Sequence, residues 1–512
     1  MTDPAKPVDG GSADADGDGS NRGAVRVRFA PSPSGDLHVG NIRTALYNWA
    51  FARRSGGAFV LRVEDTDLTR VTGEYVGAAI ETLHWLGLSW DEGPDEGGPY
   101  APYRQSERMD LYAGWARRFL DAGQAYYCYC TPGELAKRRA AARSAGGPSG
   151  YDGHCRELTG TQVAAFEAEG RRPVVRFRMP EGSTTFTDLV RGEVTIDHTA
   201  VPDFVLARAD GSPLYTLAVA VDDVTMKLTH ILRGEDLLSS TPRQIAVYRA
   251  MGVPDDQMPK FGHLPYVLGQ DGQKLSKRNG VVSIAWYRHA GFLPEALCNY
   301  LALLGWSPGD NREEFSLAEM AAEFNLARVG RNSAQFDVKK LEAINGDKIR
   351  ALEPADFARR VTPFLQEAGL VGNPVGEREA ALIAGGAPLI QERISRLTEA
   401  APMLGFAFVD EKHFTVENEA AARFLTPDSA PVLKASIAAL EAVCDWTSQA
   451  IEAALRGALV DGLGLKPRSA FGPVRVAVTG RRVSPPLFES IELLGMERTL
   501  GRLNQALASI AG

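Results

Sequence analysis

The 512-residue sequence lacks the features of a membrane or secreted protein. No run of about 18 apolar residues is available to span a bilayer, and the N-terminus has no apolar segment of the signal-peptide type. The five cysteines are too few and too unevenly spaced to form a disulfide framework. Positive charge is not in excess either, because the formal net charge is −8. We therefore expect a cytoplasmic protein without membrane contact, which binds any nucleic acid through local basic patches.

Large apolar side chains are also almost absent from residues 1–23. This segment consists mostly of Gly, Ser, Asp and Ala, which cannot offset the entropy of ordering by burial, so it is predicted to be a disordered leader. The chain as a whole has a globular composition, with 44% hydrophobic and 23% charged residues. Because its length exceeds one ordinary hydrophobic core, we expect several domains.

A strand, a turn and a helix are predicted in residues 25–46. Apolar residues alternate with arginines over 25–29, which indicates a strand with one buried face, and apolar residues at helical spacing follow the turn. Asp36 is the expected N-cap of the helix. His38 and Asn41 share one face of its first turn, where backbone N–H groups and the positive end of the dipole favour phosphate. The alternative interpretation is a buried strand–helix corner in which the histidine is only a cap.

Further charged residues follow other apolar runs. The run 58–63 is typical of a buried parallel strand and ends in Glu64, at the sheet edge where α/β proteins bind ligands, although a helix start is the alternative there. The run 214–221, followed by two aspartates, is predicted to be a strand that resumes the sheet. A later strand ends in Arg233, which either grips a carboxylate with two N–H groups or pairs with Glu235 or Asp236 next to it.

A cluster of cysteines indicates a metal site. Cys128 and Cys130 are separated by one residue, and the segment His-Cys-Arg-Glu at 154–157, which contains Cys155, begins 24 residues after Cys130. Thiolates at such spacing can hold Zn²⁺, which takes four ligands in a structural site. The fourth ligand is then His154 or Glu157. The alternative is three free cysteines that pack as small hydrophobic residues.

Cations gather in a second glycine-flanked segment, residues 269–280. Lys274, Lys277 and Arg278 lie between glycines, and cations on a loop of this kind can close on a polyphosphate and neutralise the charge that grows as pyrophosphate leaves. A solvated surface turn is the alternative.

Residues 160–215 alternate short strand patterns with turns, which predicts a small mixed insertion between two halves of an α/β sheet. Beyond residue 290 strand signals nearly vanish, and a break is predicted near 345. Helical patterns recur at 293–304, 317–324, 380–404, 432–443 and 447–459.

The His-Val-Gly-Asn turn and the Lys-Leu-Ser-Lys-Arg loop, combined with a split sheet and a helical tail, resemble class I aminoacyl-tRNA synthetases. Within that class the chain resembles the bacterial glutamyl-tRNA synthetases from about residue 24 to the end, densely over the first 310 residues and sparsely after 345. The segments that carry this likeness are Arg-Phe-Ala-Pro-Ser-Pro-Ser-Gly at 28–35, Glu-Asp-Thr-Asp at 64–67, Tyr-Arg-Gln-Ser at 103–106 and Leu-Arg-Gly-Glu-Asp at 232–236.

This resemblance implies an α/β Rossmann-type class I synthetase core with a mixed α/β insertion, followed by an all-α C-terminal region. The implied divisions are two catalytic halves at 24–120 and 214–270, an inserted acceptor-end domain with a zinc site at 121–213, a stem-contact region with the mobile Lys-Leu-Ser-Lys-Arg loop at 271–344, and a helical anticodon-binding region at 345–512.

The resemblance also implies roles for single residues. His38 and Lys277 would be catalytic, and Arg393 lies where the family reads the anticodon. The implied ligands are Arg28, Ala30, Ser32, Glu64, Tyr215 and Arg233 for glutamate; His38, Gly40, Asn41, Lys274, Ser276 and Lys277 for ATP; and Cys128, Cys130, Cys155 and Glu157 for zinc.

Four positions depart from the family pattern. Asn41 replaces the second histidine of the first motif, a variation that the glutamyl branch permits. Leu275 and Arg278 replace the methionine and the last serine of the lysine loop, which is tolerable because both lysines remain. Glu157 stands where the family's zinc pattern has histidine, so the identity of the fourth zinc ligand is open.

The implied reaction joins L-glutamate to tRNA(Glu) in two steps, with ATP and Mg²⁺, and the family's default state is a monomer. Glutamate first attacks the α-phosphate of ATP, and the terminal ribose of the tRNA then accepts the glutamyl group. The alternatives are a glutaminyl-tRNA synthetase, a truncated relative that glutamylates a modified base, a small-molecule nucleotidyltransferase and a non-catalytic tRNA-binding protein. The long helical tail disfavours the first three, and the combination of His38 with both loop lysines disfavours the last.

Overall fold

The computed structural model describes residues 24–32, 35–67, 73–144, 150–275 and 283–511. The predicted leader at 1–23, together with Ser276 and Lys277 of the lysine loop, lies outside the described residues.

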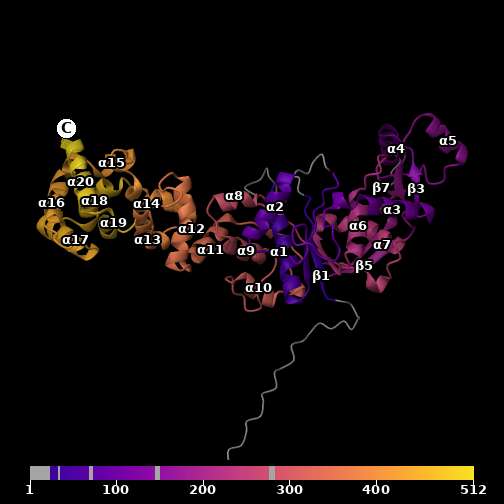
Figure 1. Cartoon of the computed structure of the whole chain (residues 1–512), viewed down its shortest axis with the longest axis horizontal. Coiled ribbons are helices and arrows are strands. Elements are labelled where there is room, and N and C mark those ends of the chain that lie inside the picture. Colours follow the sequence, from indigo (N-terminus) through magenta and orange to yellow (C-terminus); the bar gives the residue numbers. More distant parts are fainter. Residues whose placement is uncertain (1–23, 33–34, 68–72, 145–149, 276–282, 512) are drawn as a thin grey trace, which may run out of the picture.

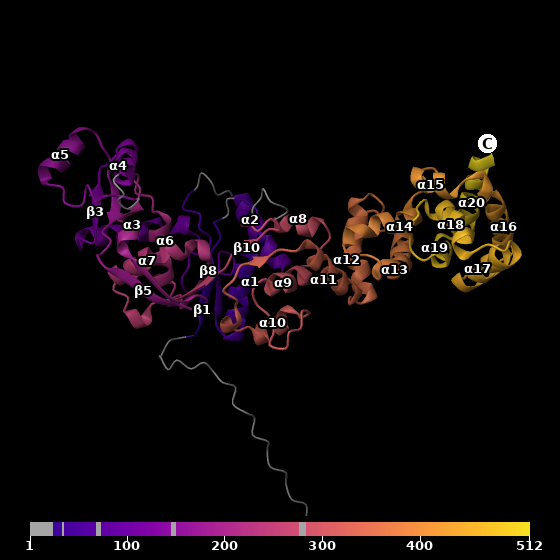
Figure 2. The ribbon, with the colours of Figure 1, turned by 180° about the vertical axis from the view of Figure 1, so that it is seen from behind.

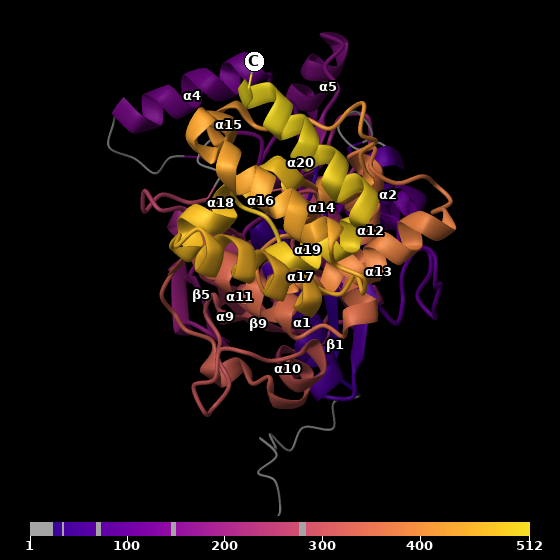
Figure 3. The ribbon, with the colours of Figure 1, turned by 90° about the vertical axis from the view of Figure 1, so that its left-hand side faces the viewer.

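The molecule is elongated, with its parts arranged along one axis (Figures 1 and 2). The insertion forms one end, the α/β core lies in the middle, and the C-terminal helices form the other end. Seen along this axis, the C-terminal helices lie in front of the core, and α4 (Pro132–Ser144) projects at the edge (Figure 3).

The predicted first unit is present as β1 (Arg26–Phe29) followed by α1 (Val39–Arg54). β1 pairs in parallel with β2 (Ala58–Leu61), and β8 (His230–Gly234) pairs in parallel with β9 (Lys260–Leu264). β1 also lies beside β8, because the Thr229 amide donates to the Arg26 carbonyl at 2.9 Å. The carboxyl ends of β1, β2 and β8 therefore meet at one edge, where α/β proteins bind ligands.

The strand predicted at 214–221 is wrong, because this segment is helix α6 (Tyr215–Thr225). All residues from Leu217 to Asp223 are buried, so the helix has no polar face and its sequence shows no helical period. An uninterrupted apolar run is compatible with either a buried strand or a buried helix.

The insertion differs from the prediction in one respect. β3 (Ala125–Cys128), β4 (Val174–Phe177) and β7 (Phe204–Ala207) form a separate antiparallel sheet. The hairpin of β5 (Ser183–Asp188) and β6 (Gly192–Asp197) instead joins the core, in a sheet of order β6-β5-β9-β8. Part of the predicted insertion is thus built into the catalytic sheet. The other helices before residue 251 are α2 (Gly73–Trp85), α3 (Met109–Asp121), α5 (Gly160–Ala168) and α7 (Thr241–Ala250).

The predicted boundary at 344/345 falls inside helix α11 (Val338–Arg350). One hydrophobic core continues from Val27 through this helix to Leu404, and another extends from Phe406 to Ala506. These two cores therefore divide near residue 405, and the domain boundaries stay a prediction.

From α11 onward the described secondary structure is helical. The short strands β10 (Val267–Leu268) and β11 (Ala334–Gln335) lie before this part of the chain. The pattern predicted as one helix at 380–404 is two helices, α13 (Glu377–Gln391) and α14 (Ala400–Phe408). None of the described helices is long and apolar enough to cross a membrane. The remaining helices after residue 283 are α8 (Ile284–His289), α9 (Pro294–Leu303), α10 (Leu317–Glu323), α12 (Pro354–Glu367), α15 (Asn418–Phe424), α16 (Ala430–Glu441), α17 (Ser448–Leu455), α18 (Pro467–Thr479), α19 (Leu487–Leu494) and α20 (Met496–Ala511).

Candidate active site

A cavity of about 240 Å³ opens at the carboxyl ends of β1, β2 and β8. It brings together every predicted glutamate and ATP ligand within the described residues, although these come from segments more than 200 residues apart. The predicted residues that line it are Arg28, Ala30, Ser32, His38, Gly40, Asn41, Glu64, Tyr215, Arg233 and Lys274.

The N-cap of α1 is His38, so the prediction of Asp36 is wrong. His38 Nδ1 accepts hydrogen bonds from the amides of Gly40 at 3.1 Å and Asn41 at 3.3 Å, and Asn41 Oδ1 accepts from the His38 amide at 3.2 Å. Asp36 instead accepts from the Ser283 hydroxyl at 3.1 Å. Because Nδ1 is an acceptor, a neutral His38 ring carries its proton on Nε2 and can donate it.

Gly40 allows the His38 ring to lie against the start of the helix. A Cβ at this position would lie 3.1 Å from His38 Nδ1 and Cε1, closer than most real Cβ contacts. A side chain at position 40 would therefore push the imidazole out of its capping position.

Glu64 is held by a buried arginine that the sequence analysis did not single out. Arg62 is fully buried, and it donates to Glu64 Oε1 at 3.0 Å and to Asp223 Oδ1 at 2.7 Å. Asp223 also lies 3.5 Å from Nε of Arg28. Burial raises the pKa of the Glu64 carboxyl, although Arg62 and Arg28 oppose the shift. Arg62 and Asp223 thus link Glu64 to Arg28 through buried ion pairs.

Arg233 does not form the ion pair that was its alternative role. Among the described residues, Glu235 pairs with Arg191, and Asp236 lies 3.6 Å from Lys274. Arg233 is 3% exposed, and burial together with the nearby charge of Arg28 lowers its pKa. A buried cation of this kind favours an anionic ligand.

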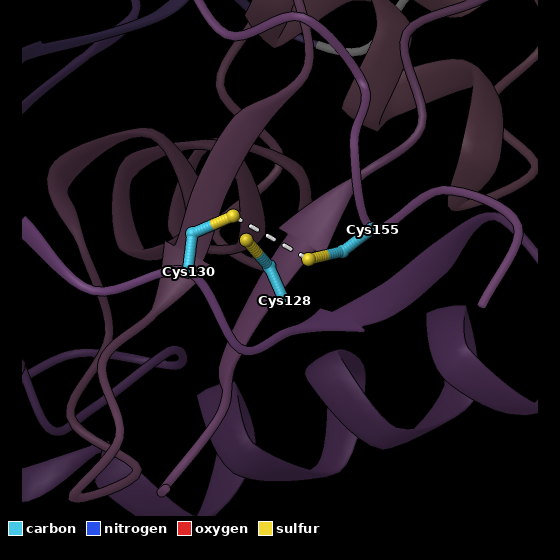
Figure 4. Close-up of side chains that lie close together, drawn as sticks. All are labelled: Cys128, Cys130 and Cys155. Atoms are coloured by element: carbon cyan, nitrogen blue, oxygen red, sulfur yellow. Dashed lines mark hydrogen bonds between the residues drawn. The ribbon is translucent and has the colours of Figure 1, made fainter. Parts of the chain in front are cut away.

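The three cysteines of the predicted zinc site lie together (Figure 4). The Sγ atoms of Cys128, Cys130 and Cys155 are within 4.8 Å of one another, and those of Cys130 and Cys155 are 3.5 Å apart. Glu157 lies apart from this cluster, because its side chain is 80% exposed and pairs with Arg178 at 2.5 Å. A metal ion bound here would need another donor.

Tyr151 supplies an oxygen next to the three thiols. Its hydroxyl lies 3.5 Å from Cys128 Sγ and accepts from the Cys155 amide at 2.7 Å. Neither His154 nor any other described histidine or carboxylate belongs to the cluster. The donor set is therefore three sulfurs and a phenolic oxygen, which fits a four-coordinate site.

A second cavity of about 910 Å³ adjoins the first, and Tyr215 lines both. Its wall is basic, because Arg139 and Arg143 of α4 face it together with Arg176 and Arg243. The arginines at 139 and 143 are four residues apart and so lie on one face of their helix.

Comparison with known proteins shows the family of this chain. The model of the class I tRNA synthetases (E and Q), catalytic domain, matches residues 24–343, and an anticodon binding domain matches residues 356–507. The glutamate–tRNA ligase of a Nocardioides species is 55% identical over 486 residues, 94% of this chain and 98% of the relative. That of Rhodococcus jostii is 54% identical, over 95% of this chain and 99% of the relative.

This chain belongs to the glutamate–tRNA ligases. A solved glutamate–tRNA ligase of Elizabethkingia meningosepticum, in complex with its amino acid, is similar to this ligase, with a TM-score of 0.81 at 32% identity. The superposition covers 95% of this chain and 100% of that one. The relatives exclude the glutaminyl alternative.

Proposed function

We propose that this ligase activates glutamate in the cavity at the carboxyl ends of β1, β2 and β8 and then transfers it to tRNA(Glu). The observation that carries the proposal is the convergence of both predicted ligand sets on one cavity. Family membership supports the overall reaction, the joining of glutamate to tRNA at the expense of ATP.

Glutamate has three charged groups, and the cavity has groups of opposite charge for two of them. Arg28 and Arg233 would hold the side-chain carboxylate, and Glu64 would hold the ammonium group. The α-carboxylate is then left to react. Its oxygen attacks the α-phosphorus of ATP, the bond from that phosphorus to the bridging oxygen breaks, and pyrophosphate leaves with the electron pair.

The start of α1 would hold ATP. His38, Gly40 and Asn41 line the cavity at the end of the helix that carries partial positive charge, and Lys274 lines it from the other side. Lys277, with Ser276, would add a second cation as pyrophosphate gathers charge. Bound Mg²⁺ would neutralise further phosphate charge. No protein nucleophile is required, because positioning and charge stabilisation account for catalysis.

The basic second cavity would receive the 3′ end of the tRNA. Its arginines can neutralise phosphates, and Tyr215 connects it to the glutamate pocket. The terminal ribose hydroxyl then attacks the glutamyl carbonyl, and AMP leaves. At the other end of the molecule Arg393, exposed at the end of α13, is proposed to contact the anticodon. We propose a monomer that works in the cytoplasm.

Zinc is proposed to bind Cys128, Cys130, Cys155 and Tyr151, where it would tie β3 to the chain beyond α4. Zinc content of the purified enzyme tests this assignment. Tyr151→Phe should lower it, whereas Glu157→Gln should leave it at one ion per chain. Loss of zinc in the Glu157 variant alone would restore the original assignment.

The reaction itself is tested by aminoacylation of tRNA(Glu) and by ATP–pyrophosphate exchange, each with glutamate or glutamine and with or without tRNA. We expect glutamate-dependent activity that requires tRNA in the exchange assay. Exchange with glutamine, or without tRNA, would contradict the proposal.

A further inference from the structure

Three side chains from neighbouring strands form a buried chain of hydrogen bonds that ends at the glutamate pocket. Asp188 Oδ2 at the end of β5 lies 2.6 Å from His263 Nδ1 in β9, and His263 Nε2 accepts from Nε of Arg233 in β8 at 3.0 Å. The side chains of Asp188 and His263 are 0% exposed. Neither residue lines the cavity, so both act on a ligand only through Arg233.

The hydrogen bonds of Asp188 determine the tautomer of His263. Asp188 Oδ1 accepts from the backbone amides of Val190 at 2.9 Å, Arg191 at 2.8 Å and His263 at 3.2 Å. A carboxylate that is surrounded by donors stays ionised, so it accepts from Nδ1–H of the ring. The lone pair of a neutral ring then lies on Nε2, which is the atom that faces Arg233.

Arg233 is therefore oriented without being neutralised. Its other hydrogen-bond partners among the described residues are also uncharged acceptors: Gln244 Oε1 at 2.6 Å, Thr241 Oγ1 at 2.9 Å and the Leu237 carbonyl at 3.3 Å. These four bonds use four of the five N–H groups of a guanidinium. One N–H and the full positive charge remain for a ligand in the cavity.

We propose that His263, held in one tautomer by Asp188, is a positioning residue that sets the selectivity of this enzyme for glutamate over glutamine. The inference rests on the proposed function, in which Arg233 binds the side-chain carboxylate. A carboxylate in place of His263 would orient the guanidinium equally well but would cancel the charge that separates glutamate from its amide. A neutral acceptor keeps both the orientation and the charge.

Asp188→Asn tests the tautomer directly. The amide oxygen of Asn can still accept from the three backbone amides, which places its NH₂ group against His263 Nδ1. The ring must then carry its proton on Nε2, where it opposes the N–H of Arg233. We expect KM for glutamate to rise at least tenfold, while kcat and KM for ATP change less than threefold. The ratio of kcat/KM for glutamate to that for glutamine should fall at least tenfold.

Two substitutions of His263 separate the hydrogen bonds at its two ring nitrogens. The amide oxygen of His263→Gln can replace Nε2 and accept from Arg233, so selectivity should stay within threefold. The shorter side chain of His263→Asn reaches only the position of Nδ1, so this variant should behave like Asp188→Asn. Because Gln has no tautomer to set, adding Asp188→Asn to His263→Gln should cause less than a threefold further change.

Wild-type enzyme provides the reference for both proposals. If wild type shows no glutamate-dependent aminoacylation, the proposed function fails. If wild type is active and Asp188→Asn keeps KM for glutamate within threefold, only the role of His263 is overturned. An equal rise in KM for ATP, or a further tenfold loss in the double variant, would also overturn it, because either result indicates a general structural effect.

Discussion

Arg233→Met should remove most of the selectivity for glutamate. The methionine keeps much of the side-chain volume but removes a cation that is 3% exposed and has only uncharged partners. Losing one partner of a buried ion pair costs about 3–5 kcal/mol. At about 1.4 kcal/mol per factor of ten, kcat/KM for glutamate should fall roughly 10²- to 10³-fold or more.

Glutamine should be affected much less by the same substitution. Its neutral amide forms an ordinary hydrogen bond with Arg233, worth about 0.5–1.5 kcal/mol, so its kcat/KM should fall by roughly tenfold at most. The two substrates are compared by aminoacylation of tRNA(Glu) at limiting amino acid. KM for ATP should stay within threefold of the wild-type value, since the residues proposed to bind ATP lie at the start of α1.

Arg243→Met is the matched control, because it removes a half-buried arginine from the neighbouring cavity. This variant should raise KM for tRNA and leave KM for glutamate unchanged. The reasoning is refuted if Arg233→Met lowers kcat/KM for glutamate by less than tenfold, or lowers it equally for both amino acids.

Three further changes test other parts of the site. Arg62→Met should lower the free energy of unfolding by about 3–5 kcal/mol, because it leaves the buried carboxylates of Asp222, Asp223 and Glu64 without their shared cation. Urea denaturation measures this change, and a loss below about 1 kcal/mol would show that the cation is dispensable. Burial raises the pKa of Glu64, so its carboxylate takes up a proton at a higher pH than an ordinary glutamate does. KM for glutamate should therefore rise as the pH falls through this raised pKa. Glu64→Gln should have a high KM at every pH, without this rise in acid. Lys277→Ala should slow adenylate formation by orders of magnitude with little loss of tRNA binding, and near-normal pyrophosphate exchange would rule out its role.

Local patterns predicted the first unit of the fold well. The change from alternating to helical spacing after the turn identifies β1 and α1, and the charges after the strands identify the cavity edge. The cap was assigned to the wrong residue because Asp is a more common N-cap than His. The imidazole Nδ1 of His38 can accept the same two amide hydrogen bonds, and nothing in the sequence alone distinguishes the two positions.

Other features depend on contacts between distant segments. The sequence predicts a strand in place of α6 because residues 217–223 are all buried, so the alternation of apolar and polar positions that identifies a surface helix is missing there. Asp188 and His263 are separated by 75 positions, and neither belongs to a motif that suggests they meet. The contact of Tyr151 with the thiols does not follow from the sequence, because metal-ligand patterns are built on Cys, His and carboxylates, and because the contact depends on how the chain beyond α4 lies against β3.

The most direct measurement is a crystal structure of the enzyme with glutamate and a non-hydrolysable ATP analogue bound. The account predicts that both occupy the cavity between β1 and β8, with the side-chain carboxylate on Arg233, the ammonium group on Glu64 and the triphosphate at the start of α1 beside His38. Glutamate bound in another cavity, or with its side-chain carboxylate away from Arg233, would contradict the account.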